Sequence, residues 1–102
     1  MYLAIYGIGA HYGATNDVSD IFWDESVACI NWGEEGAPSL HNMIKHIKVG
    51  DIIYIKTYPP DRGLTIKAIG LVIDDRVFKI DNVGEACLRM KWVWKGEEFM
   101  GK

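Results

Sequence analysis

The sequence predicts one α+β domain over residues 1–102, built as a small mixed β-barrel of about six strands with one or two short helices. Short apolar and β-branched runs alternate with Gly, Pro, Asn and Asp along the chain, which is typical of strands joined by turns. Only one long segment has a helical period, and one strand changes phase at Gly70, as expected where a small barrel bends. A chain of 102 residues supports one hydrophobic core.

The first part of the chain contains two predicted strands around a short helix. Tyr2–Gly9 is rich in aromatic and β-branched residues and is expected to be a buried strand, followed by a polar loop over Ala10–Ser19. Ser19 is expected to cap a helical turn over Asp20–Glu25. Val27–Trp32 is the second predicted strand, and a loop follows it.

The clearest helix prediction begins at Pro38, because proline is tolerated in the first turn of a helix. Four apolar residues follow at the spacing i, i+3, i+4, i+7, which forms one helical face: Leu40, Met43, Ile44 and Ile47. Gly50 is expected to end the helix with a left-handed cap. His41 is expected on the solvated side of this helix.

Two predicted strands, Asp51–Thr57 and Leu64–Ile73, flank a proline-containing loop. The alternation of the second strand switches at Gly70, so we expect a bulge or bend there. Asp74-Asp75 is expected to form a tight turn into a strand over Arg76–Ile80.

The last predicted strand is Ala86–Lys95, and the terminal GEEFMGK is expected to be frayed. Strict alternation assigns one set of side chains to one face: Leu88, Met90, Trp92 and Trp94. It assigns the other set to the opposite face: Arg89, Lys91, Val93 and Lys95.

Composition and charge limit the classes of partner. The formal net charge of −3 gives no overall attraction to a phosphate backbone or an acidic membrane. Cys29 and Cys87 lie far apart without a metal-binding cluster, so we expect no zinc site and no disulfide, with Cys29 a buried small hydrophobe. The opening YLAIYGIGA is short and lacks a basic segment, so we expect no signal peptide, no membrane association and a cytoplasmic protein.

A catalytic set is not predicted. His41 and His46 are five positions apart, about 140° around a helix, so they cannot share a ligand. Asp74-Asp75 and Glu34-Glu35 are adjacent pairs in predicted turns and loops rather than opposed carboxylates. We therefore expect no enzyme activity, no metal and no cofactor.

The order of several motifs resembles a known group. An apolar strand ending in I-G precedes a G/T/N/D-rich loop, a short helix carrying Trp23, and A-C-I-N-W-G; after a small helix come V-G-D-I-I-Y-I-K and I-K-A-I-G-L-V. Over residues 2–95 this resembles the EVE, YTH and modification-dependent restriction N-terminal branch of the PUA-like superfamily. The resemblance implies a PUA-like pseudo-barrel whose cleft holds a nucleobase, often modified or flipped, between aromatic side chains.

Trp23 and Trp32 bracket the second predicted strand and are the candidate stacking walls of such a cleft, because an indole face stacks on any base. Four polar side chains are candidates to read the edge of the base: Asn31, Tyr12, Thr15 and Asn16. Tyr58 is expected to overhang the cleft. The alternatives are tryptophans of the core or rim and a solvated loop.

Three cations are candidates to contact a nucleic-acid backbone: Lys67, Arg89 and Lys91. A charged outer strand face is the alternative. The favoured prediction is a non-catalytic module that binds a nucleobase of RNA or DNA, modified or not, or a nucleotide-like small ligand. The alternative is a protein–protein interaction or homodimerisation module.

Overall fold

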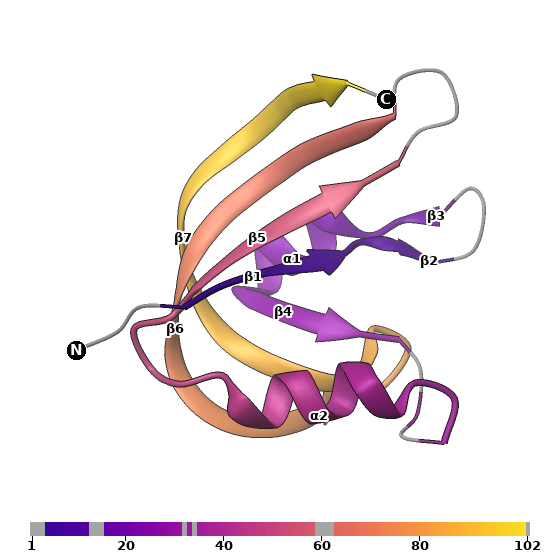
Figure 1. Cartoon of the computed structure of the whole chain (residues 1–102), viewed down its shortest axis with the longest axis vertical. Coiled ribbons are helices and arrows are strands. Elements are labelled where there is room, and N and C mark those ends of the chain that lie inside the picture. The colour runs from indigo at the N-terminus through magenta and orange to yellow at the C-terminus, as the bar shows by residue number, and fades with distance from the viewer. Residues whose placement is uncertain (1–3, 13–15, 32, 34, 59–62, 102) are drawn as a thin grey trace.

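The computed structural model describes residues 4–12, 16–31, 33, 35–58 and 63–101, and these residues confirm the predicted α+β class (Figure 1). Five strands form a mixed sheet in the order β1-β5-β6-β7-β4, and two shorter ones form a separate ribbon. The strands of the sheet are β1 (Ile5–Gly9), β4 (Val27–Ile30), β5 (Ile52–Thr57), β6 (Leu64–Ile80) and β7 (Gly84–Gly101). β1 pairs with β5 in parallel, and the other pairs are antiparallel.

The sheet is strongly curled. The long strands β6 and β7 bend together, so that the two edge strands, β1 and β4, approach and contact each other (Figure 1). Hydrogen-bonded pairing between β1 and β4 is absent from the described strands, so this sheet is not closed by a continuous ladder.

The β6–β7 hairpin is longer than predicted. β6 continues through Asp74 and Asp75, where a tight turn was expected, and β7 continues to Gly101, where a frayed tail was expected. Both predictions were wrong because each strand satisfies the backbone of the other along the whole hairpin, whatever the polarity of the side chains. The turn falls after Ile80 instead, with Asn82 at a φ of 66°.

A shift of register lies between Ile69 and Gly70, where an irregularity was predicted, but the predicted switch in the alternation of β6 at Gly70 was wrong: against β5 this strand is regular from Ala68 to Leu71, and its own change of phase falls at Lys67. Opposite this shift, Trp94 pairs with Ile69 and Trp92 pairs with Gly70, so β7 holds Val93 as an extra residue. Trp92 keeps the inward direction of Leu88 and Met90, and the bulge after it turns Trp94 to the other side of the sheet. The prediction that the two tryptophans share a face was therefore wrong.

The segment predicted as a loop over residues 10–19 contains a small antiparallel ribbon of β2 (His11–Tyr12) and β3 (Asn16–Asp17). Backbone hydrogen bonds hold its base: Ala10 donates to Lys56, and Val18 donates to Ala10. Local polarity favoured a loop, whereas pairing across the turn satisfies the same backbone groups.

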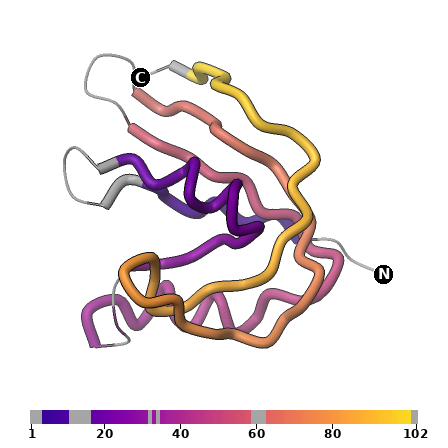
Figure 2. Tube along the Cα trace, turned by 180° about the vertical axis from the view of Figure 1, so that it is seen from behind, coloured from indigo at the N-terminus to yellow at the C-terminus, as the bar shows by residue number. Residues whose placement is uncertain are grey.

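Helix α1 (Ser19–Glu25) lies inside the curl of the sheet in both views (Figures 1 and 2). Ser19 does not cap it as predicted. The Asp17 carboxylate accepts hydrogen bonds from the Ser19 backbone N–H, at 2.9 Å, and from its hydroxyl, at 2.7 Å. Ser26, at a φ of 55°, ends the helix.

Helix α2 (Pro38–His46) begins at the predicted proline and buries the predicted apolar side against the core. It ends before Gly50, so Gly50 is not its cap; this residue adopts a φ of 94° in the next turn and donates its N–H to Val72. His41 is buried rather than solvated, so the expectation that it lies on the solvated side of this helix was wrong. Among the described residues, no helix has the length and apolar character needed to cross a membrane.

The core lies between the concave side of the sheet and the two helices, and it contains a disulfide that the sequence did not predict. Cys29 of β4 and Cys87 of β7 are register partners, with Cα atoms 4.0 Å apart, and both are fully buried. The expectation of two unpaired thiols was wrong because the pairing of β4 with β7 brings together residues 58 positions apart.

Candidate functional site

Trp23 lies on α1 with its indole half-buried against β7. Its ring stacks on that of Trp92, with centroids 6.4 Å apart and an interplanar angle of 18°. Trp92 also donates a hydrogen bond from Nε1 to the backbone carbonyl of Phe22, at 2.9 Å. The stack and the hydrogen bond together fix the position of α1 on the sheet.

A hollow of about 330 Å³ opens beside Trp23, on the side away from Trp92; we call it the Trp23 hollow. Residues of α1, β6 and β7 line it: Ser19, Asp20, Trp23, Lys67, Ala68, Lys95, Gly96 and Glu97. A shift of register between Ile66 and Ala68 turns both Lys67 and Ala68 toward α1. The hollow therefore combines an aromatic face with hydrogen-bond donors and acceptors.

The two lysines of the Trp23 hollow are held by carboxylates. Lys95 Nζ lies 3.1 Å from Asp20 Oδ1 and 5.4 Å from the centroid of the Trp23 ring, which is a cation–π distance. Lys67 Nζ lies 2.9 Å from Glu97 Oε1 and 3.6 Å from Asp17 Oδ2. Two ammonium groups thus face three carboxylates, which gives this group of side chains a net charge of −1.

These carboxylates keep Lys67 charged. Partial burial lowers the pKa of Lys67, but the hydrogen bond to Glu97 and the negative charges of Asp17, Glu97 and Asp20 outweigh it, so that the pKa is raised above its ordinary value. Lys67 is accordingly a cation whose charge is already compensated within the chain.

A second hollow of about 440 Å³ borders both rings of the Trp23–Trp92 stack, whereas the Trp23 hollow borders only the Trp23 ring. The second hollow is lined by these two rings together with Ser26, Ile73, Met90 and Lys91. The stack thus separates two hollows of different character, since only the Trp23 hollow is lined by carboxylates.

The structure separates the residues that the sequence grouped around one cleft. Asn31 follows the end of β4 and Tyr58 follows the end of β5; both are exposed, and neither lines the Trp23 hollow. Trp23 precedes β4, so the whole of that strand lies between Trp23 and Asn31 in the chain.

For the four remaining residues that were predicted to contact a ligand, the structure describes at most the backbone. Trp32 and Thr15 lie outside the described residues. Tyr12 and Asn16 contribute backbone pairing to the β2–β3 ribbon, where they are register partners. Their predicted contact with a ligand stays a prediction.

The three predicted backbone-contacting cations have different surroundings. Lys67 lies in the Trp23 hollow, paired with Glu97. The Arg89 guanidinium lies 4.6 Å from the centroid of the Phe78 ring, and Lys91 lines the second hollow. Arg89 and Lys91 are close along β7, whereas Lys67 belongs to the α1 side of the sheet.

Sequence reasoning missed four residues of the site: Trp92, Lys95, Asp20 and Glu97. Trp92 and Lys95 were assigned to opposite faces by strict alternation, and only the bulge at Val93 brings both to Trp23. The spacing of Trp92 and Lys95, three positions apart, predicts a shared face of the strand only if a bulge between them is assumed. The sequence alone does not reveal that bulge.

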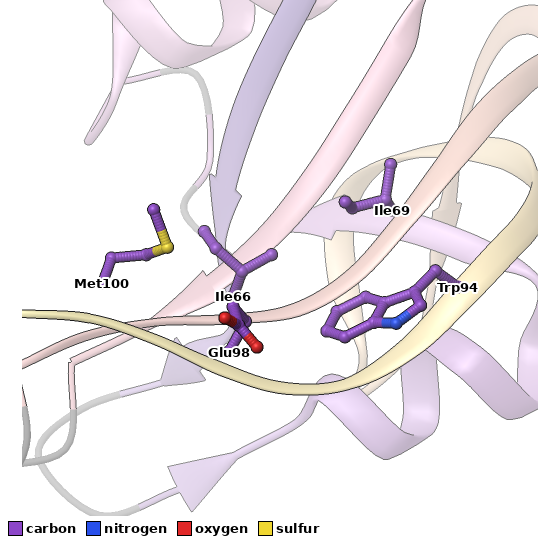
Figure 3. A pocket seen from close by; sticks show the side chains of 5 residues that line it. All are labelled: Ile66, Ile69, Trp94, Glu98 and Met100. Atoms are coloured by element: carbon purple, nitrogen blue, oxygen red, sulfur yellow. The ribbon is translucent and has the colours of Figure 1, made fainter.

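The opposite side of the sheet carries an exposed apolar surface, which we call the outer apolar face. Two hollows of about 410 and 470 Å³ share Ile66, Ile69 and Met100, so the surface is continuous. Figure 3 shows the side chains that line the first of them. Its apolar residues come from β1, β5, β6 and β7: Ile5, Ile52, Tyr54, Leu64, Ile66, Ile69, Trp94 and Met100.

Within the described part of the chain, His, Cys, Asp and Glu side chains form no group of three or more suited to a metal ion. Comparisons with protein-family models, with curated proteins and with solved structures find no match to this chain. The geometry of the chain and the resemblance of its motifs to the PUA-like superfamily are therefore the grounds for assigning a function.

Proposed function

We propose that this protein is a non-catalytic binding module with a PUA-like pseudo-barrel fold, and that it holds an uncharged nucleobase-like heterocycle in the Trp23 hollow. The curl of the sheet and the contact between its edge strands β1 and β4 support the fold assignment. One observation carries the ligand assignment: an indole ring borders a hollow that is lined by both hydrogen-bond donors and acceptors.

A planar heterocycle satisfies both parts of this hollow. Its face would stack on the Trp23 ring, for which alanine substitution in other proteins gives about 1–3 kcal/mol per base. Its edge would meet the ammonium groups of Lys67 and Lys95 as donors and the carboxylates of Asp20 and Glu97 as acceptors. Nucleobases carry donors and acceptors on the same edge.

The charge of the hollow favours an uncharged ligand. Binding a phosphate backbone depends on cations that are available to replace counterions. Here Lys67 and Lys95 are already paired, and phosphates would also meet Asp17, Asp20 and Glu97. A free base or nucleoside avoids that repulsion, so we favour it over a nucleotide or a polymer.

Binding would change the surroundings of Trp23 in a measurable way. Lys95 now lies over the ring, and a stacked heterocycle would take its place while the ammonium keeps its contact with Asp20. Exchange of a cation–π contact for a stacked ring alters indole fluorescence.

The test is titration of the four common nucleosides, and of their methylated forms, with tryptophan fluorescence and calorimetry as readouts. Trp23→Ala is expected to weaken binding by about five- to 150-fold, since it removes a stacking face worth about 1–3 kcal/mol. Trp94→Ala is the matched control, because Trp94 lies on the other side of the sheet and is expected to leave affinity unchanged.

If Trp23→Ala destabilises the fold, changes in the NMR chemical shifts of backbone amides test the same site in the wild-type protein. In the wild-type protein, the shifts caused by ligand should concentrate at residues 19–23, 67–68 and 95–97. The proposal is overturned if no nucleoside or base causes a change at millimolar concentration, or if the shifts concentrate elsewhere.

A further inference from the structure

The outer apolar face presents large side chains to solvent on the side of the sheet away from the Trp23 hollow. Ile5 and Met100 are 65% and 60% exposed, and Ile69 and Trp94 are each 37% exposed. Contiguous apolar surface of this kind is typical of association sites rather than of a free monomer surface. The partner can be inferred from how charges are arranged on this face.

The registers of β5, β6 and β7 place the outward side chains in three transverse rows. One row is Tyr54–Ile69–Trp94, with aromatic residues on both sides of an isoleucine. The next row is Lys56–Ile66–Glu98, with a cation on one side of β6 and an anion on the other. The third row is Ile52–Leu71–Lys91.

Two of these rows are self-complementary about β6, and the third sets Ile52 against the exposed Lys91. Consider two copies whose outer apolar faces lie against each other, related by a two-fold axis that runs parallel to β6 in the plane between them. This axis places the β5 side of one copy opposite the β7 side of the other. Lys56 of each copy then faces Glu98 of the second copy, and Tyr54 faces Trp94, while Ile66 and Ile69 meet near the axis. The strands of the two sheets would be nearly aligned, which is one of the two usual packings of sheets.

We propose that the outer apolar face is the interface of a homodimer whose two-fold axis runs along β6 and pairs Lys56 with Glu98 between copies. Among the described residues, neither Lys56 nor Glu98 makes an ion pair within the chain. A second copy supplies both missing partners at once. This inference is independent of the ligand proposed above.

A different two-fold axis, across the strands, would pair Glu98 with Lys91 and leave Lys56 against Ile52. Lys56 is half-buried, whereas Lys91 is exposed. An interface that leaves the half-buried Lys56 ammonium without a counter-charge costs more free energy than one that leaves the Lys91 ammonium unpaired, because the exposed Lys91 side chain can still reach water. The axis along β6 is therefore the favoured arrangement.

The test is sedimentation equilibrium of the full chain at low ionic strength, without ligand, over a wide range of protein concentration. We expect a monomer–dimer equilibrium. Lys56→Glu is expected to weaken dimerisation about tenfold, since it sets like charges against each other at two symmetric positions. Glu98→Lys is expected to do the same, and the double variant K56E/E98K is expected to restore the wild-type constant.

Lys91→Glu is the matched control, because it makes the same charge change on the same side of the sheet and is expected to alter the constant by less than about threefold. Circular dichroism verifies that each variant is folded. A protein that is monomeric at every concentration overturns the proposal. A dimer that responds to Lys91→Glu but not to Lys56→Glu, or one that the double variant does not restore, overturns it as well.

Discussion

Trp92 Nε1 donates a hydrogen bond to the backbone carbonyl of Phe22 across 70 positions of sequence, at 2.9 Å. This bond joins the longest hairpin of the sheet to the helix that carries Trp23. Trp92 points inward in phase with Met90, and the bulge at Val93 then turns Trp94 outward and brings Lys95 to the α1 side. The composition of the proposed ligand site thus depends in part on one irregularity in β7.

We expect Trp92→Phe to lower the free energy of unfolding by about 0.5–1.5 kcal/mol, because it removes one hydrogen bond to the Phe22 carbonyl, which keeps the Ser26 N–H as a donor. Trp94→Phe makes the same chemical change on the outer side of the sheet and should cost less than about 0.5 kcal/mol in the monomer. Urea unfolding at low protein concentration measures both. Equal losses in the two variants would contradict the structural role of the hydrogen bond.

Gly70→Ala should destabilise the fold by about 1–3 kcal/mol through overpacking. A Cβ at this position would lie 2.6 Å from Cε3 of Trp92 and 2.7 Å from the backbone oxygen of Lys91. Gly9→Ala is the control, since a Cβ there meets nothing within 4 Å. Thermal and urea unfolding compare the variants, and a Gly70→Ala protein as stable as Gly9→Ala would show that the close packing at Gly70 does not matter.

Thr57→Val is expected to leave stability unchanged or raise it by up to about 1 kcal/mol. The Thr57 hydroxyl is buried and has no hydrogen-bond partner among the described residues, so its removal sacrifices no contact. Thr65→Val, on the neighbouring strand, removes the hydrogen bond from Oγ1 to the Gly63 carbonyl and should cost about 0.5–1.5 kcal/mol. The midpoints of denaturant unfolding compare the two variants, and we expect Thr57→Val to be the more stable. The opposite order would show that the Thr65 hydroxyl does not make the stabilising hydrogen bond or that the Thr57 hydroxyl does make one.

Reduction of the Cys29–Cys87 disulfide should lower the free energy of unfolding by about 4 kcal/mol, because the bond closes a loop between residues 58 positions apart. Urea unfolding with and without reductant measures the difference. The double variant C29A/C87A controls for other effects of the reductant, since it should not respond to it. Two reactive thiols in the folded, non-reduced protein would contradict the disulfide.

Asp74 should titrate well below an ordinary aspartate. Hydrogen bonds from the Arg76 side chain and backbone, assisted by the charges of Arg76 and Arg89, lower the pKa of Asp74 from 3.8 to about 2. A lowered folded-state pKa stabilises the protein above pH 3.8, and this stabilisation is lost as the pH falls from about 3.8 toward 2.

Carboxyl-carbon NMR titration measures this pKa directly. Arg76→Gln should raise it toward 3.8 without restoring it fully, because the backbone N–H of residue 76 still donates. A wild-type Asp74 that titrates near 3.8 would show that the Asp74–Arg76 pair is not formed in solution. Because the Arg76 side chain is exposed to solvent, which screens the pair, the effect on overall stability should be small.

Several elements were predictable because their signals are local. Pro38 and the apolar spacing from Leu40 to Ile47 identified α2, since both depend only on residues within three turns. The α+β class followed from such local patterns.

Other features depended on the partner strand. Asp74 and Asp75 are turn formers by composition, yet they continue β6 because β7 pairs beside them. Cys29 and Cys87 gave no local sign of a disulfide, and their pairing follows from the register of β4 with β7. The grouping of Trp23 with Asn31 and Tyr58 around one cleft likewise assumed an arrangement that no local pattern specifies.

The sequence by itself determined the class of the fold, the start and apolar side of α2, and Trp23 as a candidate site residue, because these depend on neighbours along the chain. Only the tertiary structure decided that Trp23 stacks on Trp92, that Lys67 and Lys95 are neutralised by carboxylates, and that Trp94 lies on the opposite face. The physical reason is the bulge at Val93 for Trp94 and Lys95, and the shift of register between Ile66 and Ala68 for Lys67. One extra residue in a strand reverses which side chains share a face, and it is stable only in the context of the strand beside it.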